Sequence, residues 1–442
     1  MLKAGMARAD ITPPKGFTLE GYPHYPRYNE GAHDPLYATC MYLADGEEVA
    51  MVALDLLFFS KKYIEAVRKV AEDECGIPAG NIMISCTHTH SGPMTSGAID
   101  SDSLEEGRVP DEKYIAFLIR TIADIIKEAK ENCFAARFGA GTAVCGADSG
   151  IGGNRRTPGG PHDPLVSVMA VKDMNDNVRG IFVNYTLHPT FIHEWSNVCT
   201  ADYPCYLKLQ LEEMESGAIV GFTQGTSGNQ SSRYYRQGES YDEAERVGRT
   251  LGLAAHSVIE KCEWQDTLVI KTARKSVDIE IRDFGTEEEL RARIAQEEAR
   301  YKELYAKYGD SKNRDEYYLW QNANLKLLGS EDQLAYILLQ NRGIKIPMLE
   351  EETPTEVLLI RLGEVLVVGL PGELFVEYGI YIKGMVRFGM TVVHELSGCL
   401  PGYVYTPESL VTGGYETDAS MLAEDFGMKL VSTAIELSKT IR

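Results

Sequence analysis

The sequence has no run of apolar residues long enough to form a helix across a bilayer, which needs roughly 18 to 20 of them. The nearest run lies at 357–370, where Arg361 and Glu364 interrupt it, and it is typical of two core strands. Residues 1–10 have no apolar segment of the kind that a secretory signal contains. We therefore expect a cytoplasmic protein with no transmembrane segment, exported only if a leader has been removed.

Basic residues are also scarce. The 442 residues include 44 Lys and Arg against 65 Asp and Glu, a formal net charge of −21. Proteins that bind nucleic acids or anionic membrane surfaces depend on clustered Lys and Arg. The composition therefore excludes nucleic acid as an expected partner and argues against electrostatic docking to an anionic membrane.

The nine cysteines include no Cys-x-x-Cys pair, which is typical of reduced thiols rather than a disulfide framework. The sequence also lacks an internal repeat and a Pro- or Ser-rich linker. A chain of this length can bury a large core without metal or disulfide staples. We predict one domain over residues 1–442, in which a bound metal would serve chemistry.

Strands and helices alternate along the first 262 residues. Short apolar runs predict strands, and apolar residues spaced three and four apart predict helices. This alternation favours an α/β fold with a layered mixed β-sheet flanked by helices. The predicted strands are 48–55, 81–85, 166–171, 178–185 and 218–223, and the predicted helices are 61–75, 111–131, 203–214 and 240–262.

The composition changes at 286–341. The stretch 287–304 is rich in charge, and its larger apolar residues fall on one narrow helix face. This pattern predicts a helical-hairpin insertion between strands. A solvated surface is its simplest interpretation, and a lid or partner-binding element is the alternative.

Two histidines follow the strand at 81–85 in the sequence Thr87-His88-Thr89-His90. Side chains two apart on an extended chain point to the same side. Both imidazoles could bind one metal ion, or one could bind it while the other works beside it. Gly92 and Pro93 then end the strand, which places the pair at a loop edge.

His188 likewise ends an apolar strand, and Pro189 follows it. Glu373 follows the apolar run 365–370, where it is either a metal ligand or the N-cap of the next helix. A catalytic zinc needs about three nitrogen or oxygen ligands and an open position. His88 or His90, His188 and Glu373 would meet that need, whereas His193 could be structural.

A polar loop at 224–233 leaves the strand at 218–223 and contains Ser231. It lacks the Gly-x-Ser-x-Gly and Gly-Lys-Ser/Thr patterns, so neither an elbow hydrolase nor a phosphate-loop protein is indicated. Tyr403 and Tyr415 lie in two short stretches rich in Gly and Tyr. A phenol beside a metal can bind it or donate to an oxyanion.

Taken in order, these stretches resemble the catalytic domain of the neutral/alkaline (non-lysosomal) ceramidase family. The matching motifs extend from near residue 5 to residue 416. They are 5–14, 34–38, 87–93, 154–155, 187–189, 225–231, 370–373 and the pair Tyr403 and Tyr415.

The resemblance implies a role for each matching residue and implies Zn²⁺ as the cofactor. His88, His188, Glu373 and Tyr403 are similar to the family's zinc ligands. His90 is similar to the family's general base, and Ser231 to its serine required for activity. Tyr415 and Arg155 are similar to the groups that face the scissile amide.

The family's Gly-Asp-Val-Ser-Pro-Asn loop reads Gly228-Asn-Gln-Ser-Ser-Arg233 in this chain, and the family's C-terminal β-sandwich is not present in these 442 residues. The resemblance implies zinc-dependent hydrolysis of a linear amide, so the expected partner is a small-molecule or lipid-like amide substrate, N-acylsphingosine or a related N-acyl compound. The alternatives are a zinc hydrolase of a soluble N-acylated or esterified small molecule and a non-catalytic binding protein. The sequence leaves the acyl chain, the head group and the oligomeric state open.

Overall fold

The computed structural model describes residues 1–22, 24–96, 109–343, 352–399 and 401–442. It contains a nine-stranded mixed sheet in the order β13-β11-β10-β8-β1-β5-β6-β7, with β15 paired to β8. Its strands are β1 Lys3–Asp10, β5 Tyr37–Asp45, β6 Glu47–Leu54, β7 Ile82–Cys86, β8 Phe134–Val144, β10 Leu165–Asp173, β11 Val178–Tyr185, β13 Ile219–Gln224 and β15 Trp264–Gln265.

A second sheet of four strands has the order β16-β17-β18-β20. Its strands are β16 Ile270–Val277, β17 Thr355–Leu362, β18 Val365–Gly369 and β20 Met390–His394. The apolar run at 357–370 thus forms two core strands, as predicted. Short paired strands complete the structure: β2 Thr18–Leu19, β3 Arg27–Tyr28, β4 Gly31–Ala32, β9 Gly153–Asn154, β12 Val198–Cys199, β14 Gln230–Ser231, β19 Glu373–Leu374 and β21 Tyr403–Val404.

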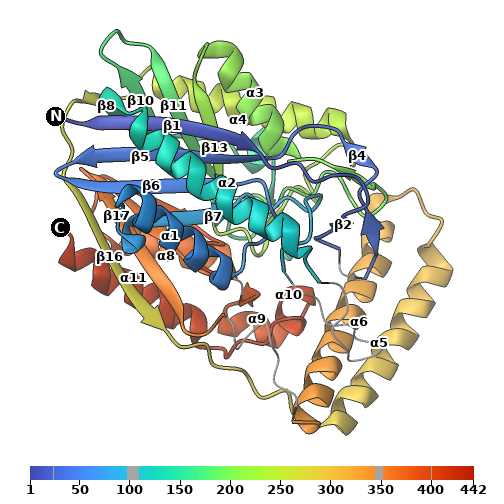
Figure 1. Cartoon of the computed structure of the whole chain (residues 1–442). Coiled ribbons are helices and arrows are strands. Elements are labelled where there is room, and N and C mark those ends of the chain that lie inside the picture. The colour runs from blue at the N-terminus through green and yellow to red at the C-terminus, as the bar shows by residue number, and fades with distance from the viewer. Residues whose placement is uncertain (23, 97–108, 344–351, 400) are drawn as a thin grey trace.

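Helices cover the outer faces of both sheets (Figure 1). Helices α1 Lys61–Cys75 and α2 Glu112–Glu131 pack on the β1-β5-β6-β7 half of the large sheet. Helices α3 Tyr203–Met214 and α4 Tyr241–Ile259 pack on β10, β11 and β13. Helices α8 Val376–Met385 and α11 Phe426–Thr440 cover the small sheet, and α9 Pro407–Thr412 and α10 Tyr415–Asp418 precede α11.

The pleat of the strands divides the core into an inner and an outer part. On β5, Cys40 and Tyr42 join the cluster beneath α1 and α2, whereas Met41 and Leu43 face the interior. That interior cluster contains residues from both halves of the large sheet and from the small sheet. Because side chains alternate along a strand, one apolar run can serve two cores.

Helices α5 Glu287–Tyr308 and α6 Arg314–Asn341 form a hairpin that projects from the sheets (Figure 1). In the chain they lie between β16 and β17, so the predicted α/β fold with a helical-hairpin insertion is confirmed. Helix α5 begins with a capping box in which Thr286 and Glu289 satisfy each other's backbone N–H groups.

Among the helices that the structure describes, none is both long and apolar enough to cross a membrane. All nine cysteines are free thiols.

The carboxyl ends of several strands meet at one edge of the fold. The backbone N–H of Glu395, after β20, donates to the carbonyl of Gln224, which ends β13, with an N···O distance of 3.0 Å. The N–H of Cys86, which ends β7, donates to Leu396. Loops that leave different parts of both sheets are thereby held against one another, and the predicted site residues lie on those loops.

Helix α2 lies directly on β1 at Gly5. A Cβ atom built at Gly5 would lie 1.7 Å from the carbonyl oxygen of Ala129, on α2. We predict that Gly5→Ala lowers the free energy of unfolding by about 1 to 3 kcal/mol, because overpacking displaces the helix. Gly384→Ala is the matched control, since Gly384 is exposed on α8 with nothing within 4 Å of such a Cβ. Chemical denaturation of both variants checks this, and equal stabilities would contradict it.

Candidate metal centre and active site

His88 lies two residues beyond the end of β7 in a strained conformation. Its φ is 67°, in the left-handed region that residues other than glycine rarely adopt. Its backbone N–H donates to Leu56, and its ring Nδ1 lies 3.3 Å from the carbonyl oxygen of Leu57. The turn fixes the orientation of the ring, which is 1% exposed.

His90 and His188 are oriented in the same way. The Nδ1 atom of His90 lies 2.9 Å from the carbonyl oxygen of Gly21, and that of His188 lies 2.8 Å from the carbonyl oxygen of Ser227. A carbonyl oxygen can only accept a hydrogen bond, so each Nδ1 carries the proton. In all three rings Nε2 is therefore the atom with a free lone pair.

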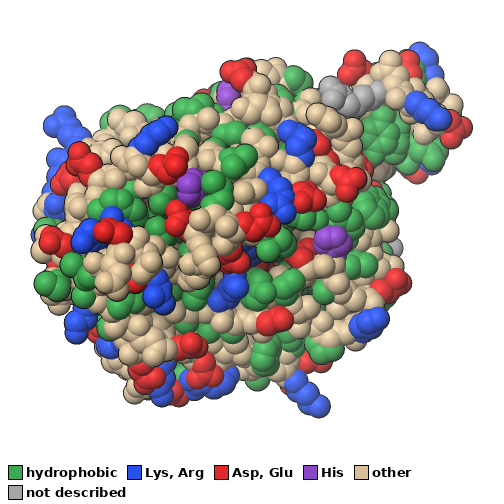
Figure 2. Space-filling model, turned by 90° about the horizontal axis from the view of Figure 1, so that it is seen from above, with side chains coloured by type: hydrophobic (Ala, Val, Ile, Leu, Met, Phe, Trp, Pro, Cys, Tyr) green, Lys and Arg blue, Asp and Glu red, His purple; other side chains and the backbone are tan. Residues whose placement is uncertain are grey.

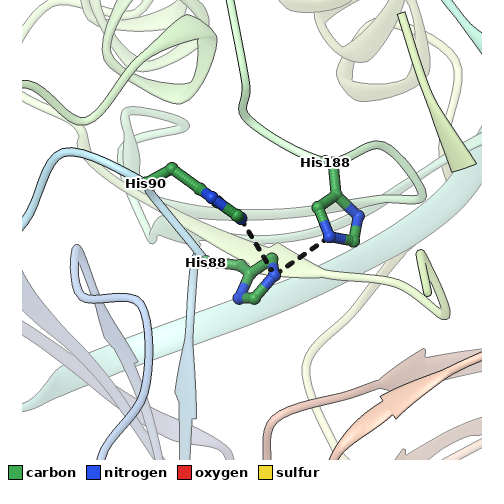
Figure 3. A group of neighbouring side chains, drawn as sticks. All are labelled: His88, His90 and His188. Carbon is green, nitrogen blue, oxygen red and sulfur yellow. Dashed lines mark hydrogen bonds between the residues drawn. The ribbon is translucent and has the colours of Figure 1, made fainter. Parts of the chain in front are cut away.

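These three Nε2 atoms point toward one another (Figure 3). The Nε2 of His88 lies 3.1 Å from that of His188 and 3.3 Å from that of His90. Ligand atoms of the three residues all lie within 4.8 Å of one another. The structure thus brings together all three histidines that the sequence proposed for this site.

Glu373 supplies a fourth electron-rich atom. Its Oε2 lies 3.2 Å from Nε2 of His88 and 3.2 Å from Nε2 of His188. The oxygen is buried and makes no hydrogen bond within the described structure. Glu373 belongs to β19, and Phe375 is the N-cap of α8. Of the two interpretations offered by the sequence, the ligand therefore fits the structure and the helix cap does not.

Burial and nearby basic groups lower the pKa values of His90 and His188. Burial, with further contributions from Arg155 and His88, lowers the pKa of His188 to about 3. Burial and the neighbouring His88 and His188 hold the pKa of His90 well below its usual range. Burial raises the pKa of Glu373, but His88 and His188 outweigh it and the net pKa lies well below the usual range.

This donor set fits a divalent transition-metal ion. Imidazole nitrogens and carboxylate oxygens are ligands that such ions prefer. His88, His188 and Glu373 supply three of them, and His90 can either bind as well or stay free beside the ion. A tetrahedral ion with bonds of roughly 2.1 Å separates its ligands by roughly 3.4 Å, close to the observed 3.1–3.3 Å. A cation between these atoms would give the orphaned Oε2 of Glu373 a partner.

Tyr403 is placed beside Glu373 by a short parallel ladder, in which the two residues are in register. Its hydroxyl accepts a hydrogen bond from Nη2 of Arg155 at 3.2 Å. Burial and the nearby Glu373 raise the pKa of Tyr403 well above its usual value, so its phenol is neutral. The contact with Arg155 places Tyr403 at the edge of the histidine cluster.

Arg155 and Ser231 are brought together by the pairing of β9 with β14. Ser231 is opposite Gly153, and the N–H of Arg155 donates to the carbonyl of Asn229. The guanidinium of Arg155 also pairs with Glu416, with Nε 2.8 Å from Oε1. Two segments that are far apart in the sequence thus form one wall of the site.

A cavity of about 410 Å³ adjoins the histidine cluster. It is lined by the predicted site residues His90, Arg155, Ser231, Tyr403 and Tyr415. Burial and Asp332 raise the pKa of Tyr415, so its hydroxyl is a neutral hydrogen-bond donor. All eight predicted residues lie either in the cluster or on the cavity that opens from it.

Sequence reasoning missed a second layer around the cluster. Ser227 Oγ lies 3.1 Å from Nδ1 of His188 and donates to Oε1 of Glu395 at 2.5 Å. The other oxygen of Glu395 accepts from the N–H of Leu374, next to Glu373. Glu395 thus positions two of the candidate ligands. A sequence signal existed, because Glu395 directly follows the apolar stretch that forms β20.

His193, which the sequence left as a structural candidate, also lines the cavity. Its Nε2 accepts a hydrogen bond from Nη1 of Arg236 at 2.8 Å. It therefore belongs to the cavity wall and not to the histidine cluster.

The fold and the site define a layered α/β protein with a cluster of potential metal ligands on the loops at its strand ends. No model of a known protein family matches the chain. The chain is similar to the neutral ceramidase of Pseudomonas aeruginosa, with 24% identity over 251 residues, which is 51% of this chain. The aligned part spans 36% of the length of that relative.

Two solved structures share the fold. One is the neutral ceramidase from Pseudomonas aeruginosa, with a TM-score of 0.73 and 18% identity over 99% of this chain and 74% of that one. The other is a ceramidase complexed with C2, with a TM-score of 0.74 and 16% identity over 100% of this chain and 75% of that one. The resemblance to neutral ceramidases that the motifs indicated is confirmed, and the chain has their fold.

The cluster predicts that the protein binds one divalent transition-metal ion. His188→Ala removes a donor atom and should abolish stoichiometric metal, whereas Glu395→Ala leaves all donors present and should weaken affinity roughly 10- to 100-fold. The metal content of purified protein, measured by mass spectrometry before and after chelator competition, checks both variants. His256→Ala is the control, because His256 is on α4 and contacts Glu215. Equal metal content in His188→Ala and His256→Ala would contradict the assignment.

Proposed function

We propose that the protein is a zinc-dependent hydrolase that cleaves the linear amide bond of N-acylsphingosine or a related N-acyl compound. The observation that carries this proposal is the convergence of three imidazole nitrogens and a carboxylate oxygen at the edge of a cavity. The likeness in sequence and fold to neutral ceramidases supports the choice of an amide as the bond that is cleaved.

His88, His188 and Glu373 would hold the zinc ion, with Tyr403 at its edge. When bound, zinc supplies Lewis acidity, which polarises an amide carbonyl and makes water a stronger acid. The ligands are held by the protein before any substrate arrives, because each imidazole is hydrogen-bonded through Nδ1 to a backbone carbonyl. Such orientation of metal ligands by a second layer is typical of catalytic sites.

His90 is the general base in this proposal. Its Nε2 carries a lone pair because Nδ1 donates to Gly21, and its lowered pKa keeps it neutral. It would accept the proton of the attacking water at Nε2 and pass it to the nitrogen of the leaving amine. His90 lines the cavity, so both proton transfers can take place at the position where the amide would bind.

Arg155 and Tyr415 would stabilise the charge that develops on the amide oxygen. Both line the cavity, and both carry hydrogens that can be donated at neutral pH. Donors that are already in place when the oxyanion forms contribute strongly to acyl-transfer catalysis. Ser231, 4% exposed at the cavity wall, would contact a hydroxyl or carbonyl group of the substrate.

The first test is amide hydrolysis by the zinc-loaded protein. Release of amine from N-acylsphingosine and from short N-acyl amides should be abolished by a chelator and restored by Zn²⁺. His90→Gln should lower kcat by about 10²- to 10⁴-fold because the general base is lost.

His256→Gln, on the outer helix α4, is the control and should retain the activity of the unaltered protein. Turnover that survives complete removal of metal, or full activity of His90→Gln, would overturn the proposed mechanism.

A second test concerns oxyanion stabilisation. Tyr415→Phe removes one hydroxyl without changing the packing of the ring, which lies 6.0 Å from that of Tyr403 between centroids. We predict a fall in kcat of about 10²- to 10³-fold, the usual cost of losing one oxyanion donor. Tyr305→Phe, on the exposed side of α5, is the control. A change confined to KM would assign Tyr415 to substrate binding instead.

A further inference from the structure

The inserted hairpin forms one wall of the active-site cavity. Helix α6 contributes Gln321, Asn322, Leu325, Lys326 and Leu328 to its lining, opposite the residues around the histidine cluster. Residues of the hairpin are therefore placed to contact a molecule bound in the cavity.

The cavity is cationic in a chain that is strongly acidic. Its lining includes five basic side chains and, among the described residues, one carboxylate, although Asp and Glu outnumber Lys and Arg by 65 to 44 in the whole chain. On the outer face seen in Figure 2, acidic and basic side chains are interspersed. The basic residues of the lining are Arg155, Arg156, Arg233, Arg236 and Lys326, and the carboxylate is that of Glu416.

The carboxylate of Glu416 is shared by two guanidinium groups. Its Oε1 lies 2.8 Å from Nε of Arg155, and its Oε2 lies 2.8 Å from Nη1 of Arg156. Outside the lining, Glu239 pairs with Arg236, and Glu297 lies 3.7 Å from Lys326. Among the described residues, the Arg155–Arg156 pair thus shares one ion-paired carboxylate.

Arg233 adds a further positive charge to the cavity lining. Its Nη1 donates to the neutral Oδ1 of Asn322 at 2.9 Å, and its guanidinium lies 5.7 Å from the ring centroid of Tyr318. Tyr318 in turn donates its hydroxyl to the carbonyl of Arg233 at 2.6 Å. Within the described part of the chain, Arg233 forms no ion pair with a carboxylate. Two residues of α6 thus hold a partly buried cation in place at the cavity wall.

A partly desolvated cation without a counter-ion lowers stability, and a bound anion would remove that cost. A guanidinium recognises a carboxylate or phosphate by paired, charge-assisted hydrogen bonds. A neutral ceramide has no group that could supply the missing negative charge. The positive charges are therefore matched to a substrate that carries an anionic group into the cavity.

We propose that this cavity selects N-acyl compounds bearing an anionic group, and that Arg233, held by Asn322 and Tyr318, is the specificity-determining contact. The inference rests on the proposed amidase function and names its substrate class. The anion can be on the amine part or on the acyl part of the substrate, since both would place a negative charge in the cavity.

The test compares matched substrates with the zinc-loaded full chain. N-octanoylglycine carries a carboxylate on the amine part, the monoethanolamide of suberic acid carries one on the acyl part, and N-octanoylethanolamine is neutral. We expect at least one anionic substrate to exceed the neutral one in kcat/KM by roughly 10- to 100-fold, the effect of one charge-assisted contact. Arg233→Gln should remove that ratio, and Arg233→Lys should restore part of it.

Arg179→Gln is the control for loss of one positive charge, because Arg179 is 51% exposed near the start of β11. It should leave the ratio unchanged. Equal kcat/KM values for the neutral substrate and both anionic ones would overturn the inference while the amidase function stands. An anionic-to-neutral ratio of kcat/KM that Arg233→Gln leaves intact would do the same.

Calorimetric binding of N-octanoylglycine separates the two claims further. Binding that depends on Arg233, without hydrolysis of any of the three amides, would overturn the amidase function and support the anion site.

Discussion

The structure depends on one electrostatic constraint, the convergence of four electron-rich atoms in a buried place. The Nε2 atom of His88 lies 3.1–3.3 Å from Nε2 of His188, Nε2 of His90 and Oε2 of Glu373. Each histidine Nδ1 donates to a backbone carbonyl. Lone pairs at this distance repel unless a cation lies between them, and burial strengthens that repulsion. The left-handed backbone of His88 and the buried side chain of Glu395 belong to the surrounding structure that holds these atoms together, although their repulsion costs free energy.

The two sheets provide this scaffold by delivering their strand ends to one place. The ligand candidates lie on loops that follow β7, β11 and β18, and short ladders such as β19 with β21 set their register. The cavity wall is completed by α6, so the cluster would provide the chemistry and the hairpin would select the substrate.

Local patterns predicted the fold well because the strands and helices are strongly periodic. The helix at 61–75 ends at Gly76, as its spacing indicated, and the runs around 178–185 and 357–370 form buried strands. The histidines could be placed at strand ends for the same reason. The sequence could not distinguish a cap from a ligand at Glu373, nor find the contact of Glu395 with Ser227 or that of α6 with Arg233. Those features depend on packing between segments that are 89 to 168 residues apart.

The central claim is that a metal ion binds between His88, His188 and Glu373. Anomalous diffraction from crystals of the purified protein, with data collected on both sides of the zinc absorption edge, tests it directly. The account predicts a single strong zinc peak within about 2.0 to 2.2 Å of both Nε2 atoms and a carboxylate oxygen of Glu373. A protein fully loaded with zinc at another place, with no peak among these three side chains, would contradict it.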